Sequence, residues 1–137
     1  MVRSALVAAV AAGALGLVGP AGRAQCPSPR VAVQPRRAAQ LAEITVTGTH
    51  WATGCSDDCG GCGSCGPPGR VANLRVVLID RSGGRRVLAS GLTADKDYRV
   101  EVQVTLPQDV APGPYKVQLV NDRHRADRAA RLTIVRA

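Results

Sequence analysis

The chain has 137 residues, of which 18 are basic and 10 acidic, so its formal net charge is +8. This length predicts a single domain. The aromatic residues are only Trp51, Tyr98 and Tyr115, and phenylalanine is absent. So few rings cannot build a base-stacking surface. Since the basic residues are also dispersed along the chain, we expect no nucleic-acid partner.

The first 24 residues have the composition of a secretory signal peptide. Ala5 to Val18 form an uninterrupted apolar run that is shorter than a membrane span, and Gly22-Arg23-Ala24 follows with small residues at the positions that a signal peptidase reads. We therefore expect residues 1–24 to be removed and residues 25–137 to form a secreted or cell-envelope domain without a transmembrane helix. The alternative is that the apolar run forms a buried N-terminal helix.

Beyond the signal, apolar and polar residues alternate in short runs, which predicts strands and no helix. The clearest run is 99–106, where Val100, Val102, Val104 and Leu106 are expected to face the core and Arg99, Glu101, Gln103 and Thr105 the solvent. Strands are expected at 31–35, 41–49, 74–79, 86–89, 99–106, 115–119 and 132–134, with Gly and Pro turn signals between them. This predicts an all-β, two-sheet sandwich with Greek-key connections, and a small closed barrel is the alternative.

Two stretches resemble the bacterial immunoglobulin-like modules found in exported and cell-envelope proteins of high-GC Gram-positive bacteria. Residues 44–51, ITVTGTHW, are similar to strand B of these modules, and residues 111–117, APGPYKV, to the start of strand F. The resemblance covers about 31–135. It implies an immunoglobulin-like sandwich of about seven strands, a non-catalytic role, and a loop between strands B and C at 52–70. It also implies a tyrosine corner in which the Tyr115 hydroxyl bonds back to the chain.

The segment 52–70 is rich in glycine and holds four of the five cysteines, while the fifth lies before the first strand. Export favours disulfides within the set Cys26, Cys55, Cys59, Cys62 and Cys65, and an odd number leaves one unpaired. We expect Cys26 to bridge to this segment, although the spacing does not choose its partner. Lipid anchoring through Cys26 is disfavoured because Gln25, rather than a small residue, precedes it.

Two other kinds of chemistry fit the same thiols. Cys55, Cys59, Cys62 and Cys65 could hold zinc tetrahedrally, with His50 or His124 joining them, and their spacing also approaches that of an iron–sulfur site. Redox activity is the weakest interpretation, because the glycines around the thiols and the two prolines that follow exclude the helix that usually activates a CxxC pair. We expect disulfides and no cofactor.

The topology of such a sandwich brings the turn 121–127 and the loop 91–96 to the same end as the cysteines. The candidate partner contacts are Arg123, His124, Arg125 and Arg128. These cations favour an anionic envelope polymer or an acidic protein surface, and the alternative is a solvated turn. No catalytic motif is present, so we expect a non-enzymatic exported domain with a structural or interaction role at the cell envelope. The alternative function is a small extracytoplasmic cysteine-loop protein that binds a metal ion such as zinc.

Overall fold

The computed structural model describes residues 27–54 and 68–137, which form strands and turns with no helix among them. The strands are β1 (Arg30–Gln34), β2 (Arg37–Ala39), β3 (Glu43–Thr49), β4 (Ala52–Thr53), β5 (Gly69–Arg70), β6 (Leu74–Ile79), β7 (Arg85–Leu92), β8 (Val100–Thr105), β9 (Gly113–Val120) and β10 (Ala130–Val135). The all-β expectation is confirmed for this part of the chain. The predicted signal peptide and all five cysteines lie outside the described residues.

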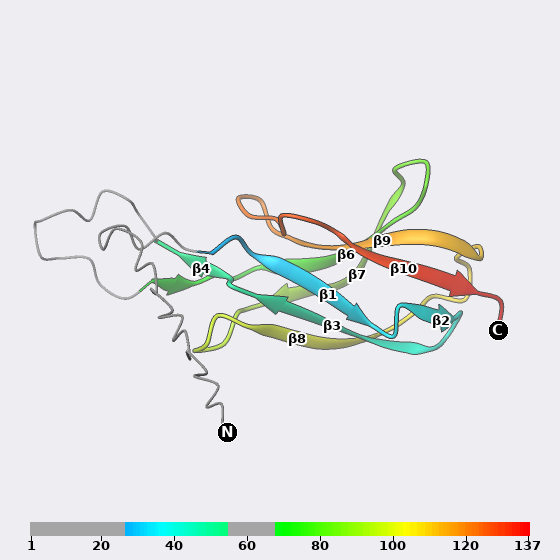
Figure 1. Ribbon diagram of the computed structural model, residues 1–137, viewed down its shortest axis with the longest axis horizontal. Coiled ribbons are helices and arrows are strands. Elements are labelled where there is room, and N and C mark those ends of the chain that lie inside the picture. The colour runs from blue at the N-terminus through cyan, green and yellow to red at the C-terminus, as the bar shows by residue number, and fades with distance from the viewer. Residues whose placement is uncertain (1–26, 55–67) are drawn as a thin grey trace, which may run out of the picture.

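Eight of the strands form two sheets (Figure 1). One sheet has the order β1-β3-β8 and the other the order β2-β10-β9-β6-β7. Within each sheet neighbouring strands run antiparallel, except that β2 runs parallel to β10. The strands β4 and β5 pair with each other in a short ribbon that closes the base of the segment 55–67.

The two sheets face each other across one apolar core. Ile44 and Val46 of β3 contribute to it from the three-stranded sheet, and Val76, Leu119 and Leu132 contribute from the five-stranded sheet. These side chains are almost fully buried because each strand alternates, with apolar residues on the inner side and exposed or half-buried residues on the outer side. The alternation that fixes the core therefore also fixes what each sheet presents to solvent.

The chain changes sheets after its first strand, at Pro35. Proline cannot donate a backbone hydrogen bond, so β1 ends there. One residue further on, Arg37–Ala39 form β2, which pairs with β10 so that Arg37 lies opposite Thr133. Thr133 donates its backbone N–H to the Arg36 carbonyl at 2.8 Å. We did not expect this strand, because Arg37-Ala38-Ala39 is too short to show an alternation.

Two aromatic residues hold the ends of the cysteine segment in place. Trp51 is fully buried, and its indole Nε1 donates to the Arg30 carbonyl at 3.1 Å. On the other side of the segment, the Tyr98 hydroxyl donates to the Pro68 carbonyl at 2.9 Å. The described residues next to the segment 55–67 are thus held in place by these contacts and by the β4–β5 pairing.

The third aromatic residue, Tyr115, has the structural role that its position predicted. Its hydroxyl donates to the Ala111 carbonyl at 2.6 Å, which ties the start of β9 to the turn that precedes it. This contact leaves the hydroxyl engaged inside the fold.

Candidate functional site

The outer side of the five-stranded sheet carries one basic residue on each of its strands. These residues are Arg37, Arg75, Arg85, Lys116 and Arg131, and we call them the basic face. They face outward because each lies next to an inward-facing residue in sequence or opposite an outward-facing residue in the register. Arg131, for example, lies beside the buried Leu132. All are exposed except Arg75, which is half-buried.

The register aligns several of these side chains across the sheet. Arg131 lies opposite Lys116, Lys116 opposite Ile79, and Ile79 opposite Arg85. The four residues form one row perpendicular to the strands, on neighbouring strands that are spaced by about 4.8 Å, so the row extends about 14 Å. Three of its four members are cations that lie far apart in the sequence.

A groove with a volume of about 600 Å³ lies on this face. It is lined by Ile79, Asp80, Arg81, Gly83, Pro114, Tyr115, Lys116, Arg131, Leu132 and Thr133. Three cations from three different elements, Arg81, Lys116 and Arg131, therefore converge on one hollow, and Ile79 and Pro114 add apolar surface to it. We call this hollow the sheet groove.

The only acid that lines the sheet groove is engaged in its own turn. The Asp80 Oδ1 atom accepts hydrogen bonds from the Ser82 hydroxyl at 2.6 Å, from the Ser82 N–H at 2.9 Å and from the Gly84 N–H at 2.8 Å. These bonds, the Ser82 hydroxyl first, hold the pKa of Asp80 below its ordinary value. Asp80 is therefore a turn-forming carboxylate, and the three cations leave the groove with a net positive charge.

The cations of the sheet groove also have no acidic partner within the described residues. The two ion pairs found there join Arg75 to Asp122 at 3.4 Å and Arg86 to Asp109 at 2.7 Å. Both lie outside the groove. The second pair keeps the pKa of Asp109 low, because Arg86 donates a hydrogen bond to its carboxylate.

The other sheet has the opposite charge balance. Its three strands carry one arginine, Arg30, and two glutamates, Glu43 and Glu101, which gives a net charge of −1. The five strands of the basic sheet carry six basic residues, the sixth being Arg86, and no acid at all. Among the strands, therefore, the positive charge lies on the five-stranded sheet, although Arg75 and Arg86 are paired with Asp122 and Asp109 from neighbouring turns.

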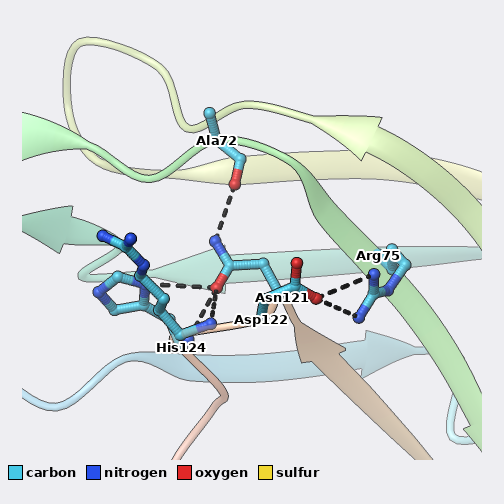
Figure 2. A network of polar contacts seen from close by, with 6 residues as sticks. Ala72, Arg75, Asn121, Asp122 and His124 are labelled. Atoms are coloured by element: carbon cyan, nitrogen blue, oxygen red, sulfur yellow. Dashed lines mark hydrogen bonds and ion pairs between the residues drawn. The ribbon is translucent and has the colours of Figure 1, made fainter.

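The turn that the sequence singled out is held by a compact network (Figure 2). Asn121 Oδ1 accepts from the backbone N–H of Arg123 at 2.9 Å and of His124 at 2.7 Å, and lies 3.3 Å from the His124 Nδ1 atom. Its amide nitrogen donates to the Ala72 carbonyl at 2.8 Å. The ring of His124 thus has a structural partner.

The arginines of this turn are exposed, and they do lie at the end of the molecule where the cysteine segment begins. Asp127 donates its N–H to the Pro29 carbonyl at 2.9 Å, and Ala94, in the loop before β8, donates to the Val71 carbonyl at 2.9 Å. Arg128 borders a hollow together with Arg30, Val31 and Asp127. The arginines of this turn remain candidate contacts at the rim of the molecule.

The disulfide and metal interpretations of Cys26, Cys55, Cys59, Cys62 and Cys65 lie outside the described residues. Within 27–54 and 68–137, no three residues of the types His, Cys, Asp and Glu come close enough together to hold a metal ion. Among these residues there is also no helix of the length and hydropathy needed to cross a membrane.

Comparisons with known proteins give a likeness in structure but no match in sequence. No family model matches the chain, and no curated protein matches it. Among solved structures, it is similar to the alkylpurine DNA glycosylase AlkC of Pseudomonas fluorescens bound to DNA containing an abasic site analog, with a TM-score of 0.49 and 11% sequence identity. The match covers 79% of this chain and 30% of that chain.

This finding corrects two of our expectations. The protein of the solved structure holds DNA, which stands against our exclusion of nucleic acid and our choice of an envelope polymer or protein as partner. It also stands against the structural or interaction role at the cell envelope. We withdraw these interpretations. At 11% identity and a TM-score of 0.49 the likeness transfers no activity, so any function must be argued from the residues of this chain.

Sequence reasoning missed the basic face. It located a charged turn, whose arginines are neighbours in sequence, and overlooked Arg81, Arg85, Lys116 and Arg131, which are not. A signal was nevertheless present, because the outward positions of 74–79 and 115–119 contain Arg75 and Lys116 and no acid, and Arg131 directly precedes 132–134.

Proposed function

We propose that this domain binds nucleic acid through its phosphates, using the basic face and the sheet groove. The observation that carries the proposal is the separation of charge between the two sheets. Six basic residues and no acid lie on the strands of one sheet, while the strands of the other carry a net charge of −1. Phosphate neutralisation by such a surface supplies most of the affinity in sequence-independent binding.

The chemistry of the groove supports contacts to phosphate rather than to bases. Arg81 and Arg131 offer planar guanidinium donors and Lys116 an ammonium group, all of which suit phosphate oxygens. The aromatic residue at the groove, Tyr115, packs against the apolar core, so it adds no stacking platform. The expected binding is therefore independent of sequence, with a dissociation constant of about 10⁻⁴ to 10⁻⁶ M at physiological salt.

We also propose that the fold is immunoglobulin-like and that the domain binds without catalysis. The strand order, in which the chain moves between two facing sheets and β2 runs parallel to β10, supports the first part. The Tyr115 hydroxyl bonded to Ala111 at the start of β9 supports it as well. A groove lined by cations and one engaged carboxylate supports the second part. Export through residues 1–24 remains a prediction, and the binding proposal does not depend on it.

The test is binding of a short fluorescein-labelled DNA oligonucleotide, followed by fluorescence anisotropy over a range of salt concentrations. The variant replaces Arg81, Lys116 and Arg131 by Gln. If each contacts one phosphate of a single strand, the variant should reduce the slope of log affinity against log salt by about 2.

A matched control distinguishes the loss of the groove cations from a general loss of net charge. Replacing Arg30, Arg70 and Lys96 by Gln removes the same charge from exposed positions elsewhere on the domain. This control should change the slope much less than the groove variant does. Equal slopes for the two variants, or no binding by the unaltered protein at low salt, would refute the proposal, provided that circular dichroism shows an intact fold.

A further inference from the structure

The turn between β6 and β7 rises beside the basic face. Arg81 and Gly83 of this turn line the sheet groove together with Arg131 and Thr133 of β10. Since β10 lies two strands away from β6 in the sheet, this hollow crosses the outer side of β9, and the turn forms one of its sides. Figure 1 shows this turn standing out from the sheet beyond β9.

The turn is also internally braced. Besides the three hydrogen bonds that Asp80 Oδ1 accepts, the Asp80 N–H donates to the Gly84 carbonyl at 3.0 Å and the Gly83 N–H to the Asp80 carbonyl at 3.1 Å. Gly83 has a φ of 86°, which a residue with a side chain rarely adopts. These bonds hold the turn in one compact shape, so it can act as a firm wall of the groove.

A firm wall discriminates between stiff and flexible polyanions. Double-stranded DNA has a persistence length of about 150 base pairs and behaves as a straight rod over the length of one domain. Laid along the row of Arg131, Lys116 and Arg85, such a rod meets the raised turn before its phosphates reach the floor of the groove. A single strand can bend around the turn.

We propose, resting on the proposed function, that the sheet groove selects single-stranded over double-stranded nucleic acid. A strand beside the turn would have Arg81 on one side and Lys116 and Arg131 on the other, so cations from three elements approach its phosphates. Ile79 and Pro114 give its sugars and bases an apolar surface without hydrogen-bonding groups that could read sequence. Backbone contacts from a basic groove are the usual basis of sequence-independent single-strand binding.

The test compares one labelled oligonucleotide, alone and annealed to its complement, on the same protein at the same salt. The single strand should bind at least about tenfold more tightly than the duplex. Equal affinity would overturn the selection while leaving the proposed function intact, and no binding of either would refute the proposed function itself. Single-stranded RNA of the same sequence should bind within about threefold of the DNA, since the phosphates are shared. A larger difference would overturn recognition by phosphate alone.

Two variants test whether the turn between β6 and β7 causes the preference for single strands. Ile79 and Arg85 are register partners, so an Asn-Gly turn can join them in place of residues 80–84. This variant should bind single strand and duplex within about threefold of each other. Arg81→Gln keeps the wall but removes its charge, so it should weaken binding to the single strand and reduce the preference without abolishing it. A shortened turn that keeps the full preference, or an Arg81→Gln variant that loses it, would contradict the role of the wall.

Discussion

The close approach of β3 to the indole of Trp51 leads to a specific prediction about stability. Gly48 lies on the inner side of β3, and a Cβ atom there would lie 2.5 Å from Trp51 Nε1 and 2.6 Å from Leu119 Cδ2. Carbon atoms in contact prefer about 3.5–4.0 Å, so both neighbours would have to move by about 1 Å. Gly48→Ala is therefore an overpacking substitution at the point where the two sheets meet.

The neighbours cannot move freely. Trp51 and Leu119 are both fully buried, and the Trp51 Nε1 atom donates to the Arg30 carbonyl at 3.1 Å. Shifting the indole would break this bond and leave a buried donor unsatisfied, which costs about 1–3 kcal/mol. Alanine is favoured over glycine in a strand by about 0.5–1 kcal/mol, which offsets only part of that cost. We expect Gly48→Ala to lower the free energy of unfolding by about 2 kcal/mol.

The assay is urea unfolding followed by circular dichroism, with the fluorescence of Trp51, the single tryptophan, as a second probe. A loss of about 2 kcal/mol corresponds to a melting temperature about 8–16 °C lower for a domain of this size. In a Trp51→Phe background the same substitution should cost less, because the smaller ring leaves room for the methyl group. A Gly48→Ala protein as stable as the unaltered one, or an equal cost in both backgrounds, would refute this account of the contact.

Three further outcomes are expected. Val46→Asp should unfold the domain, because it buries an unpaired carboxylate at a fully buried position, while Glu101→Lys on the exposed side of β8 should be nearly silent; similar melting of the two would contradict the register. Ser82→Ala should raise the pKa of Asp80 in an NMR titration, since it removes the hydrogen bond that lowers this pKa most. Because the pKa of Asp80 is depressed in the fold, the stability linked to it is present above about pH 4 and is lost as the pH falls further. An unchanged pKa in the variant would contradict the role of this bond. Lys116→Glu should raise the urea midpoint while it weakens DNA binding, and both can be measured on one preparation.

Much of the fold follows from alternation alone. Val100 and Val104 are buried and Glu101 is exposed, as the pattern of 99–106 predicted, and the strand 74–79 coincides with β6. These predictions succeed because each strand has one face against a single core. The alternation within a few neighbouring residues is then enough to show which side chains are buried. The strand β2 escaped prediction, because its pairing with β10 depends on contacts about 95 residues away in sequence.

The candidate site could not be predicted in the same way. Alternation shows that Lys116 and Arg131 face outward, but not that their strands are neighbours in one sheet. The juxtaposition of Arg81 with Arg131 also requires the turn to rise beside the outer side of the sheet, which is a tertiary feature. A charge cluster that is contiguous in sequence, such as Arg123 to Arg128, is visible without this knowledge, and for that reason it drew attention away from the basic face.

The pairing of Lys116 with Arg131 connects stability to function. These two cations lie directly opposite each other on β9 and β10, and the strands of this sheet carry no acid to separate them. Like charges opposite each other destabilise a sheet, and opposite charges stabilise it by about 0.2–1 kcal/mol. Lys116→Glu converts the first arrangement into the second, so the free energy of unfolding should rise by up to about 1 kcal/mol even as affinity for single-stranded DNA falls.

A matched change distinguishes this reasoning from an effect of net charge. Arg70→Glu alters the charge equally but sits in β5 opposite Ala52, so no repulsive pair is relieved. We expect it to leave stability and binding nearly unchanged. If the cations served only solubility, Lys116→Glu would stabilise the fold without weakening binding. If it instead destabilised the fold, the two cations would not repel each other in the native sheet. A gain in stability together with a loss of binding is expected only when an unfavourable charge pair is retained because a phosphate is bound between its members.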